Sequence, residues 1–206
     1  MEKVKEVPYG VADFVTVMEQ NLYYVDKTMF IPELEKQPRN LFFIRPRRFG
    51  KSIFLSMLHS YYDCNQSAKF QSLFGNLWIG QHPTELQGKY QVLFLDFSQV
   101  SGNIDSLERN FDFYCSVKLD GFIRRYGESY CEETREKVRK AEYAMDKLAF
   151  IHDEAEQKGF SLYLIVDEYD NFTNVVLNEH GEKVYHAITH ADGFYRDVFK
   201  KFKGNF

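Results

Sequence analysis

Residues 41–62, LFFIRPRRFGKSIFLSMLHSYY, constrain the fold more than any other part of the chain. The apolar run at residues 41–44 predicts a short buried strand, and the apolar residues after Ser52 recur at the spacing of one helix face. Gly50 and Lys51 lie between the two patterns, directly before Ser52. A strand, a tight turn, Gly-Lys-Ser and a helix together form the context of a phosphate-binding loop.

The physical chemistry of a helix start explains why this pattern suits phosphate. Unpaired backbone N–H groups and a partial positive charge stabilise an anion there. Gly50 lets the backbone approach the phosphates, Lys51 reaches the β and γ oxygens, and the Ser52 hydroxyl holds Mg2+. The general pattern has a further glycine six residues before the lysine, where this chain has Arg45, and Pro46 can set the turn instead. The predicted nucleotide-binding residues are Arg45, Pro46, Arg47, Arg48, Phe49, Gly50, Lys51, Ser52 and Ile53.

A second diagnostic stretch, SLYLIVDEYD at residues 161–170, joins an apolar run to adjacent carboxylates. The run predicts a buried strand with Asp167 and Glu168 at its C-terminal tip. Such a strand end places one carboxylate where it can hold Mg2+ through water, and the next where it can orient or deprotonate an attacking water. We therefore predict a metal role for Asp167 and a catalytic role for Glu168, with Asp96 and Asp170 as the next carboxylates to test.

Two smaller polar groups each have two interpretations. Residues 92–97 predict another buried strand, and Asp96 near its end either faces the ligand side of the sheet or caps the next loop. Asp26, Lys27 and Thr28 follow an aromatic run and either cap the next helix or line the nucleotide site.

Composition limits the class of protein. Lys and Arg total 26 against 30 Asp and Glu, a net charge of −4, which excludes nucleic-acid binding by overall charge alone. The three cysteines, Cys64, Cys115 and Cys131, form no CxxC pair and indicate free thiols in a reducing compartment. No apolar leader or membrane-length apolar run is present, so we expect a cytoplasmic location and no membrane partner.

The remaining motifs say less about function. Residues 104–159 are expected to be helical, with ETREKVRKAE as a solvated helix face. His186 and His190 stand four residues apart without a third ligand, so a solvated helix face is favoured over a metal site. Trp78, the single tryptophan, is expected in the core. The candidates for contacting phosphate charge are Arg47, Arg48 and Arg196.

Several motifs, taken in their order along the chain, resemble those of a known protein family. YYVDKT, LFFIRPRRFGKSIFLSML, LFLDF, LYLIVDEYDNF and GFYRDVFKKFKG together resemble the AAA-ATPase-like family of bacterial P-loop proteins, often fused to a PD-(D/E)XK nuclease-like C-terminal region. The resemblance implies an α/β P-loop NTPase of the additional-strand-catalytic-Glu type, with a mostly parallel sheet flanked by helices. It implies Walker A roles for Lys51 and Ser52, and Walker B roles for Asp167 and Glu168. Arg45 departs from the general P-loop but matches the RPRRFGKS loop of this family.

From these features we expect an N-terminal segment, residues 1–40, that packs on a P-loop ATPase core, residues 41–206, with a helical insertion at about 104–159. The predicted function is ATP binding and hydrolysis, with Mg2+, to control an attached effector. A nucleotide-dependent switch or scaffold with little turnover is the alternative, and a P-loop kinase ranks lower because Glu168 suits a water nucleophile. The resemblance implies a C-terminal nuclease-like region in the full-length protein, with a nucleic-acid or protein partner reached through it.

The resemblance also implies a sheet that is incomplete at residue 206. In relatives a further strand, with a polar sensor residue, follows FYRDVFKKFKG and lies between the P-loop strand and the Asp-Glu strand. Unpaired buried backbone groups cost on the order of 1–3 kcal/mol each, against a total stability of roughly 5–15 kcal/mol. We therefore expect residues 1–206 to be part of a longer polypeptide and to be poorly soluble and weakly active alone.

Overall fold

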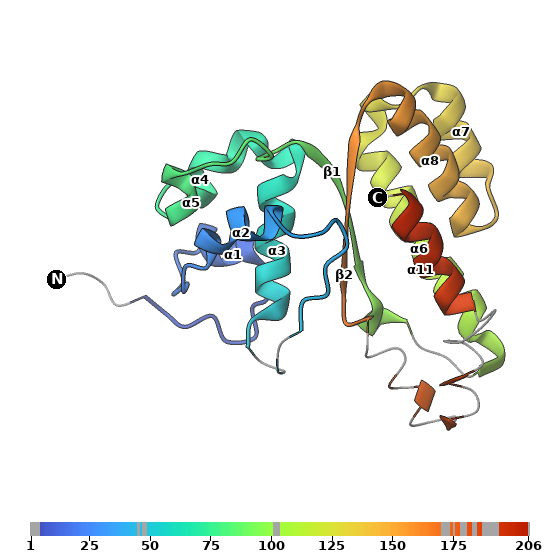
Figure 1. Ribbon diagram of the computed structural model, residues 1–206, viewed down its shortest axis with the longest axis horizontal. Helices are drawn as coiled ribbons and strands as arrows, with labels where there is room; N and C mark the ends of the chain where they lie inside the picture. The colour runs from blue at the N-terminus through green and yellow to red at the C-terminus, as the bar shows by residue number, and fades with distance from the viewer. Residues whose placement is uncertain are drawn as a thin grey trace. The chain divides into compact units, whose positions relative to one another are not determined.

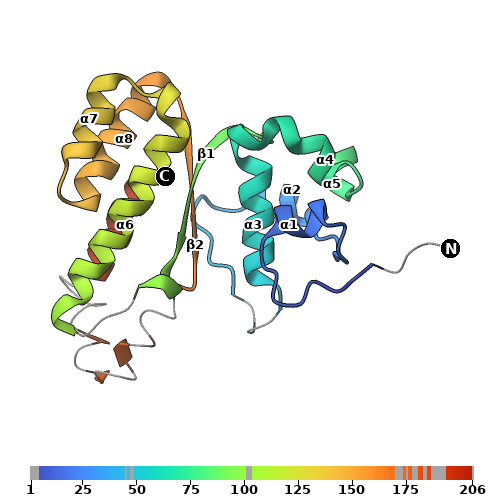
Figure 2. The same cartoon turned by 180° about the vertical axis from the view of Figure 1, so that it is seen from behind.

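The computed structural model describes residues 5–44, 46, 49–100, 104–169, 174, 176, 177, 181, 182, 185, 186 and 194–205. The chain separates into two compact units, residues 1–90 and residues 91–206. Figures 1 and 2 show the two from opposite sides, and each is described separately below. The expected boundary at residue 40 stays a prediction.

The N-terminal unit is built from helices and connecting segments. Its helices are short except for α3, and α1, α2, α4 and α5 gather on one side of it (Figure 1). The elements in order are α1 (Phe14–Glu19), the 3-10 turn η1 (Thr28–Phe30), α2 (Ile31–Glu35), α3 (Lys51–Tyr62), η2 (Cys64–Lys69), α4 (Phe70–Phe74) and α5 (Trp78–Gln81).

The α3 helix forms as its apolar spacing predicts and provides the centre of this core. Phe54, Met57 and Tyr61 are buried along one face. The Phe74 ring from α4 lies 5.5 Å from that of Tyr61 and 4.9 Å from that of Phe14, measured between ring centroids. Aromatic contacts of this kind add to the hydrophobic gain from burial, so they hold α1, α3 and α4 together.

A polar link fixes α1 to the middle of α3. The Ser56 hydroxyl accepts a hydrogen bond of 2.9 Å from the Phe14 N–H and donates one of 3.1 Å to Asp13. Asp13 is also the N-cap of α1, since its carboxylate accepts from the Thr16 N–H at 2.7 Å. Burial raises the pKa of Asp13, but the hydrogen bonds from Thr16 and Ser56 outweigh it and leave the pKa below its ordinary value.

The C-terminal unit combines a pair of strands with longer helices. Strands β1 and β2 are neighbours and run in the same direction, and helices α6, α8 and α11 lie on one side of them (Figure 1). The elements in order are β1 (Tyr90–Asp96), η3 (Phe97–Gln99), α6 (Ile104–Tyr126), η4 (Gly127–Ser129), α7 (Glu132–Lys140), α8 (Ala144–Lys158), β2 (Ser161–Asp167) and α11 (Phe194–Asn205).

Much of the predicted architecture is confirmed. The apolar runs predicted at residues 92–97 and 162–166 form strands β1, which ends at Asp96, and β2, and residues 104–159 are largely helical. The charged run is α7, whose Lys137 and Lys140 pair with acidic residues one turn earlier on the same solvated face. A parallel sheet flanked by helices is therefore present as a two-stranded sheet, whereas the additional-strand type stays a prediction.

The prediction of a strand at residues 41–44 is wrong. These residues have no regular secondary structure, and the exposed fractions of Phe42 and Ile44 are 64% and 81%. An apolar run supplies suitable side chains, but a strand also needs a neighbour that completes its backbone hydrogen bonds. The one sheet among the described residues consists of β1 and β2 and does not include this segment.

Trp78 also departs from expectation. Its exposed fraction is 38%, and its indole stacks on the His82 ring with 4.5 Å between ring centroids. It begins α5, where its neighbour Ile79 takes the buried position instead. One turn of helix presents too narrow a face to bury both side chains.

The cysteines are free thiols, as predicted. Burial raises the pKa of Cys115 to about 12, with a smaller contribution from the Asp112 charge, so this thiol stays protonated and unreactive. Across the described residues, none of the helices combines the length and the apolar character needed to cross a membrane.

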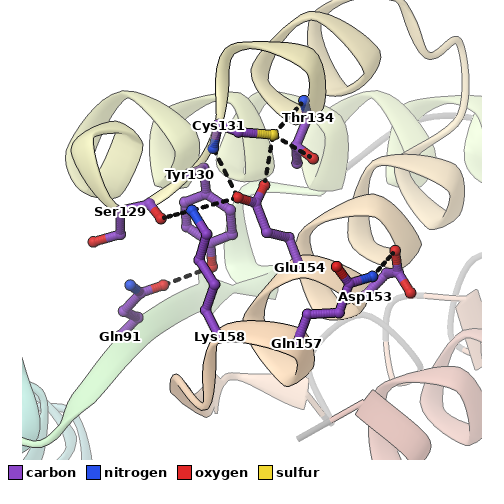
Figure 3. A network of polar contacts seen from close by, with 9 residues as sticks. All are labelled: Gln91, Ser129, Tyr130, Cys131, Thr134, Asp153, Glu154, Gln157 and Lys158. Atoms are coloured by element: carbon purple, nitrogen blue, oxygen red, sulfur yellow. Dashed lines mark hydrogen bonds and ion pairs between the residues drawn. The ribbon is translucent and has the colours of Figure 1, made fainter.

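A polar network ties the start of α7 to α8 (Figure 3). Glu154 on α8 accepts a hydrogen bond of 2.8 Å from the Cys131 N–H and forms an ion pair of 2.6 Å with Lys158. Cys131 is the N-cap of α7, because its sulfur accepts from the Thr134 N–H at 3.5 Å. Lys158 also donates to the Ser129 carbonyl at 2.9 Å. One buried carboxylate therefore joins the start of α7 to α8.

We expect Glu154→Gln to lower the free energy of unfolding at pH 7 by on the order of 2 kcal/mol. Burial raises the pKa of Glu154, but hydrogen bonds from Lys158, Cys131 and Thr134 outweigh it and lower the pKa from 4.5 to about 2. The stabilisation is therefore complete above pH 4.5 and is lost as the pH falls toward 2. Urea unfolding at pH 7 and pH 3 measures both effects.

The matched control for this prediction is Glu156→Gln. Glu156 lies on the same helix but is exposed, so its replacement should leave stability within about 0.5 kcal/mol. Equal effects of the two substitutions would contradict a specific role for the Glu154 network.

Candidate functional site

Gly50 is the N-cap of α3 and has a left-handed backbone conformation, with φ 74° and ψ 31°. This region is open to glycine at little cost and strains most other residues. The first helical hydrogen bond runs from the Phe54 N–H to the Gly50 carbonyl at 3.2 Å. The backbone thus turns sharply at the predicted glycine and enters the helix at Lys51.

The start of α3 has the electrostatic character that an anion site requires. Lys51 and Ser52 are the first two residues of the helix, where backbone N–H groups have no acceptor within the helix. The first turn contains no acidic residue. The positive end of the helix dipole therefore remains uncompensated by its own first turn.

The structure brings together only part of the predicted loop. Phe49, Gly50, Lys51, Ser52 and Ile53 are consecutive at the helix start, and the Phe49 N–H donates to the Pro46 carbonyl at 3.4 Å. The predicted residues Arg45, Arg47 and Arg48 lie outside the described residues, and so do Asp170 and His190.

Asp26 and Thr28, the first and last residues of the Asp26-Lys27-Thr28 cluster, act as caps. Asp26 accepts hydrogen bonds from the Thr28 N–H at 2.8 Å, from the Thr28 hydroxyl at 2.7 Å and from the Trp78 N–H at 2.7 Å. Thr28 is fully buried, and its hydroxyl oxygen accepts from the Ile79 N–H at 3.1 Å. Both side chains therefore satisfy the start of α5, a helix distant in the sequence, rather than only the helix that follows them.

The Lys27 side chain approaches Gly50, whereas those of Asp26 and Thr28 contact α5. A Cβ atom placed on Gly50 would lie 3.5 Å from Lys27 Nζ and 3.4 Å from the Ile53 side chain. The ammonium group of Lys27 is thus adjacent to the turn into α3. The sequence offered no means to separate the role of Lys27 from that of Asp26 and Thr28, since only tertiary structure sets the three directions.

We expect Asp26→Ala to lower the free energy of unfolding by about 2 kcal/mol, because it removes the acceptor of three hydrogen bonds, two of them from backbone N–H groups. Urea unfolding followed by circular dichroism measures this loss. Glu85→Ala, which replaces an exposed carboxylate of the same unit, is the control. A loss of similar size in the control would contradict the capping role.

In the C-terminal unit, β2 ends at the predicted carboxylate pair. Asp167 is the last residue of β2, with an exposed fraction of 4%, and its carboxylate accepts from the Glu168 N–H at 2.9 Å. Glu168 has φ 53°, in the left-handed region that a residue with a β-carbon rarely adopts. Such strain is retained where the surrounding structure fixes it and is concentrated at functional sites.

Asp96 ends β1, the strand beside β2. Its carboxylate accepts from the Ser98 N–H at 3.0 Å and so caps η3, while its own N–H donates to the Tyr114 hydroxyl at 2.7 Å. Burial raises the pKa of Tyr114 to about 12, so its hydroxyl stays protonated. The capping interpretation of Asp96 therefore accounts for its contacts, and the carboxyl ends of both strands carry aspartate.

The remaining candidates are spread over the C-terminal unit. Arg196 is exposed on α11. His186 lies 3.4 Å from Glu182 and is exposed. No group of three or more His, Cys, Asp or Glu side chains among the described residues is arranged to hold a metal ion.

Comparison with known families adds the decisive observation. The family model described as Predicted AAA-ATPase matches residues 8–205, nearly the whole chain. The chain belongs to this predicted AAA-ATPase family. Membership supports ATP binding at the level of the family and agrees with the glycine turn into α3.

A curated relative is also similar over part of its length. The uncharacterized protein in the vnfD 5′ region of Azotobacter chroococcum mcd 1 is 43% identical over 63 residues, which is 30% of this chain and 12% of that protein. The match thus spans a small part of a much longer relative. No solved structure matches.

Proposed function

We propose that this AAA-ATPase family member binds and hydrolyses ATP and that its nucleotide state controls an attached effector or partner. The observation that carries the proposal is the left-handed Gly50 turn into α3, directly before Lys51 and Ser52. An isolated Gly-Lys-Ser sequence has low specificity for nucleotide binding. The family match over residues 8–205 therefore adds support that the tripeptide alone does not give.

The residues at the start of α3 suit the Walker A role. Backbone N–H groups of the first turn and the Lys51 ammonium bind phosphate oxygens, and the Ser52 hydroxyl supplies a hard oxygen ligand for Mg2+. The lack of an acidic residue in the first turn supports an anionic ligand, since a carboxylate there would repel phosphate.

The residues at the end of β2 suit the Walker B role. Asp167 would hold Mg2+ through a bridging water, and Glu168 would orient or deprotonate the attacking water. When bound, Mg2+ would supply positive charge that offsets the charge of the phosphates. The strained backbone of Glu168 supports a functional role for this side chain.

The deciding experiment measures Mg-ATP binding by calorimetry and phosphate release by the full-length protein, with and without DNA. Binding together with release, stimulated by a partner, supports the ATPase. Binding without release identifies the switch or scaffold, and a phosphorylated acceptor identifies a kinase. Absence of Mg-ATP binding contradicts all three functions.

The location of the protein and the partners of this activity are proposed as well. We propose a cytoplasmic protein whose effector is a C-terminal nuclease-like region, with a nucleic-acid or protein partner reached through it. Size-exclusion chromatography of the full-length protein with DNA, at several salt concentrations, tests the nucleic-acid partner, because phosphate contacts weaken steeply as salt rises.

A further inference from the structure

The Lys27 ammonium is a cation next to the predicted phosphate loop but outside that loop in sequence. It lies 3.5 Å from the position that a Cβ atom on Gly50 would occupy. Lys27 is half-buried, and its ammonium makes no hydrogen bond or ion pair with any residue that the structure describes.

The position of Lys27 is fixed by its neighbours rather than by its own side chain. Asp26 and Thr28 bind the start of α5 through the Trp78 and Ile79 N–H groups. The Lys27 carbonyl accepts from the Phe30 N–H at 3.2 Å. The backbone on both sides is therefore anchored, which fixes the point from which the flexible side chain reaches the turn.

This arrangement gathers positive charge at the start of α3. The start of a helix carries partial positive charge, which destabilises nearby cations. Lys51 is the first residue of α3, Lys27 lies beside the residue before it, and the first turn contains no carboxylate. A phosphate group bound there would offset this positive charge.

We propose that Lys27 is a second phosphate-binding lysine, which donates hydrogen bonds to phosphate oxygens of the nucleotide held at the start of α3. The inference rests on the proposed ATP-binding function and extends it to a residue far from the Gly-Lys-Ser motif in the sequence. Two ammonium groups from separate segments then contact one polyanion, and the Asp26 and Thr28 caps serve to position one of them.

The test compares Mg-ATP affinity of the wild type, Lys27→Met, Lys27→Arg and Lys89→Met by calorimetry. Methionine keeps the apolar stem of lysine but has no charge. We expect Lys27→Met to weaken binding about 10- to 100-fold, the worth of a hydrogen bond to a charged group. Lys27→Arg should recover part of the loss, because it restores the cation.

Lys89→Met is the matched control for charge. Lys89 is exposed, and its neighbour Gly88 donates to the Tyr61 carbonyl at 3.0 Å, at the other end of α3. This end is roughly 16 Å from the start of the helix. We expect the Mg-ATP affinity of Lys89→Met to stay within about twofold of wild type, because solvent and salt screen a charge at that distance.

Thermal unfolding without nucleotide separates ligand binding from a structural role. Lys27→Met should unfold at the same temperature as wild type or a higher one, because it removes a cation from the positive end of a helix. Its stabilisation by added Mg-ATP should be smaller than that of wild type. A lower unfolding temperature without nucleotide would indicate a structural role and overturn the inference.

The outcomes distinguish this inference from the proposed function. If wild type binds Mg-ATP, Lys51→Ala does not, and Lys27→Met binds within twofold of wild type, the inference alone is wrong. Equal losses in Lys27→Met and Lys89→Met also overturn it, since they indicate a general effect of net charge. If the wild type itself fails to bind Mg-ATP, the proposed function is wrong as well.

Discussion

Replacing Lys51 by alanine is expected to abolish Mg-ATP binding and to leave the fold intact. Lys51 begins α3, and the buried face of this helix is formed by later residues, including Phe54 and Met57. Removal of the ammonium therefore removes little packing but takes away a charge-assisted contact to the β and γ phosphates. We expect at least a 100-fold loss of affinity in calorimetry, with an unchanged circular dichroism spectrum.

Lys36→Ala is the control for this experiment. The Lys36 side chain has an exposed fraction of 67% and pairs with Glu33 on the same turn, so its loss should change neither binding nor stability measurably. Unchanged Mg-ATP affinity in Lys51→Ala would show that the P-loop assignment is wrong. A simultaneous loss of circular dichroism signal would instead assign Lys51 a role in folding and contradict the expected result.

The elements that sequence predicted best are those whose pattern is complete within one segment. The apolar positions of α3 recur with helical spacing and are buried as that spacing requires, with Met57 and Tyr61 fully inside. Strands β1 and β2 come from continuous apolar runs, which are typical of strands covered by helices. In both cases the local preference agrees with the surroundings that the fold provides.

Residues 41–44 are the counterexample, since their pattern is as apolar as that of β2. A strand is defined by the hydrogen bonds of a neighbour, and a single segment of sequence contains no information about whether a neighbour is available. The prediction for Trp78 was wrong for a related reason, because which side of a one-turn helix is buried depends on what packs against it.

The candidate site shows the same limit at the level of single side chains. The sequence predicted that Gly50 permits an unusual backbone, and the structure has φ 74° there. It could not predict that Lys27 approaches Gly50 while Asp26 binds α5, because these contacts join segments separated by more than 20 residues. The left-handed backbone of Glu168 is equally hidden, since glutamate has no local preference for it.

The catalytic assignment depends on Glu168, and its position after β2 gives the assignment a physical basis. Holding a glutamate at φ 53° costs on the order of 1–3 kcal/mol. A glycine at this position would avoid that cost. We expect Glu168→Gly to raise stability or leave it unchanged while abolishing turnover, a combination that a purely structural glutamate would not produce.

Glu168→Gln is the sharper test, because it preserves shape and backbone strain and removes only the basic carboxylate. We expect Mg-ATP affinity within about twofold of wild type and phosphate release reduced at least 100-fold, the usual contribution of a positioned general base. Asp167→Ala, in contrast, should also weaken the dependence of binding on Mg2+, since it removes a metal ligand. A Glu168→Gln protein that still hydrolyses ATP at the wild-type rate would move the catalytic role to another carboxylate, and Asp96 at the end of the neighbouring strand would be the next to replace.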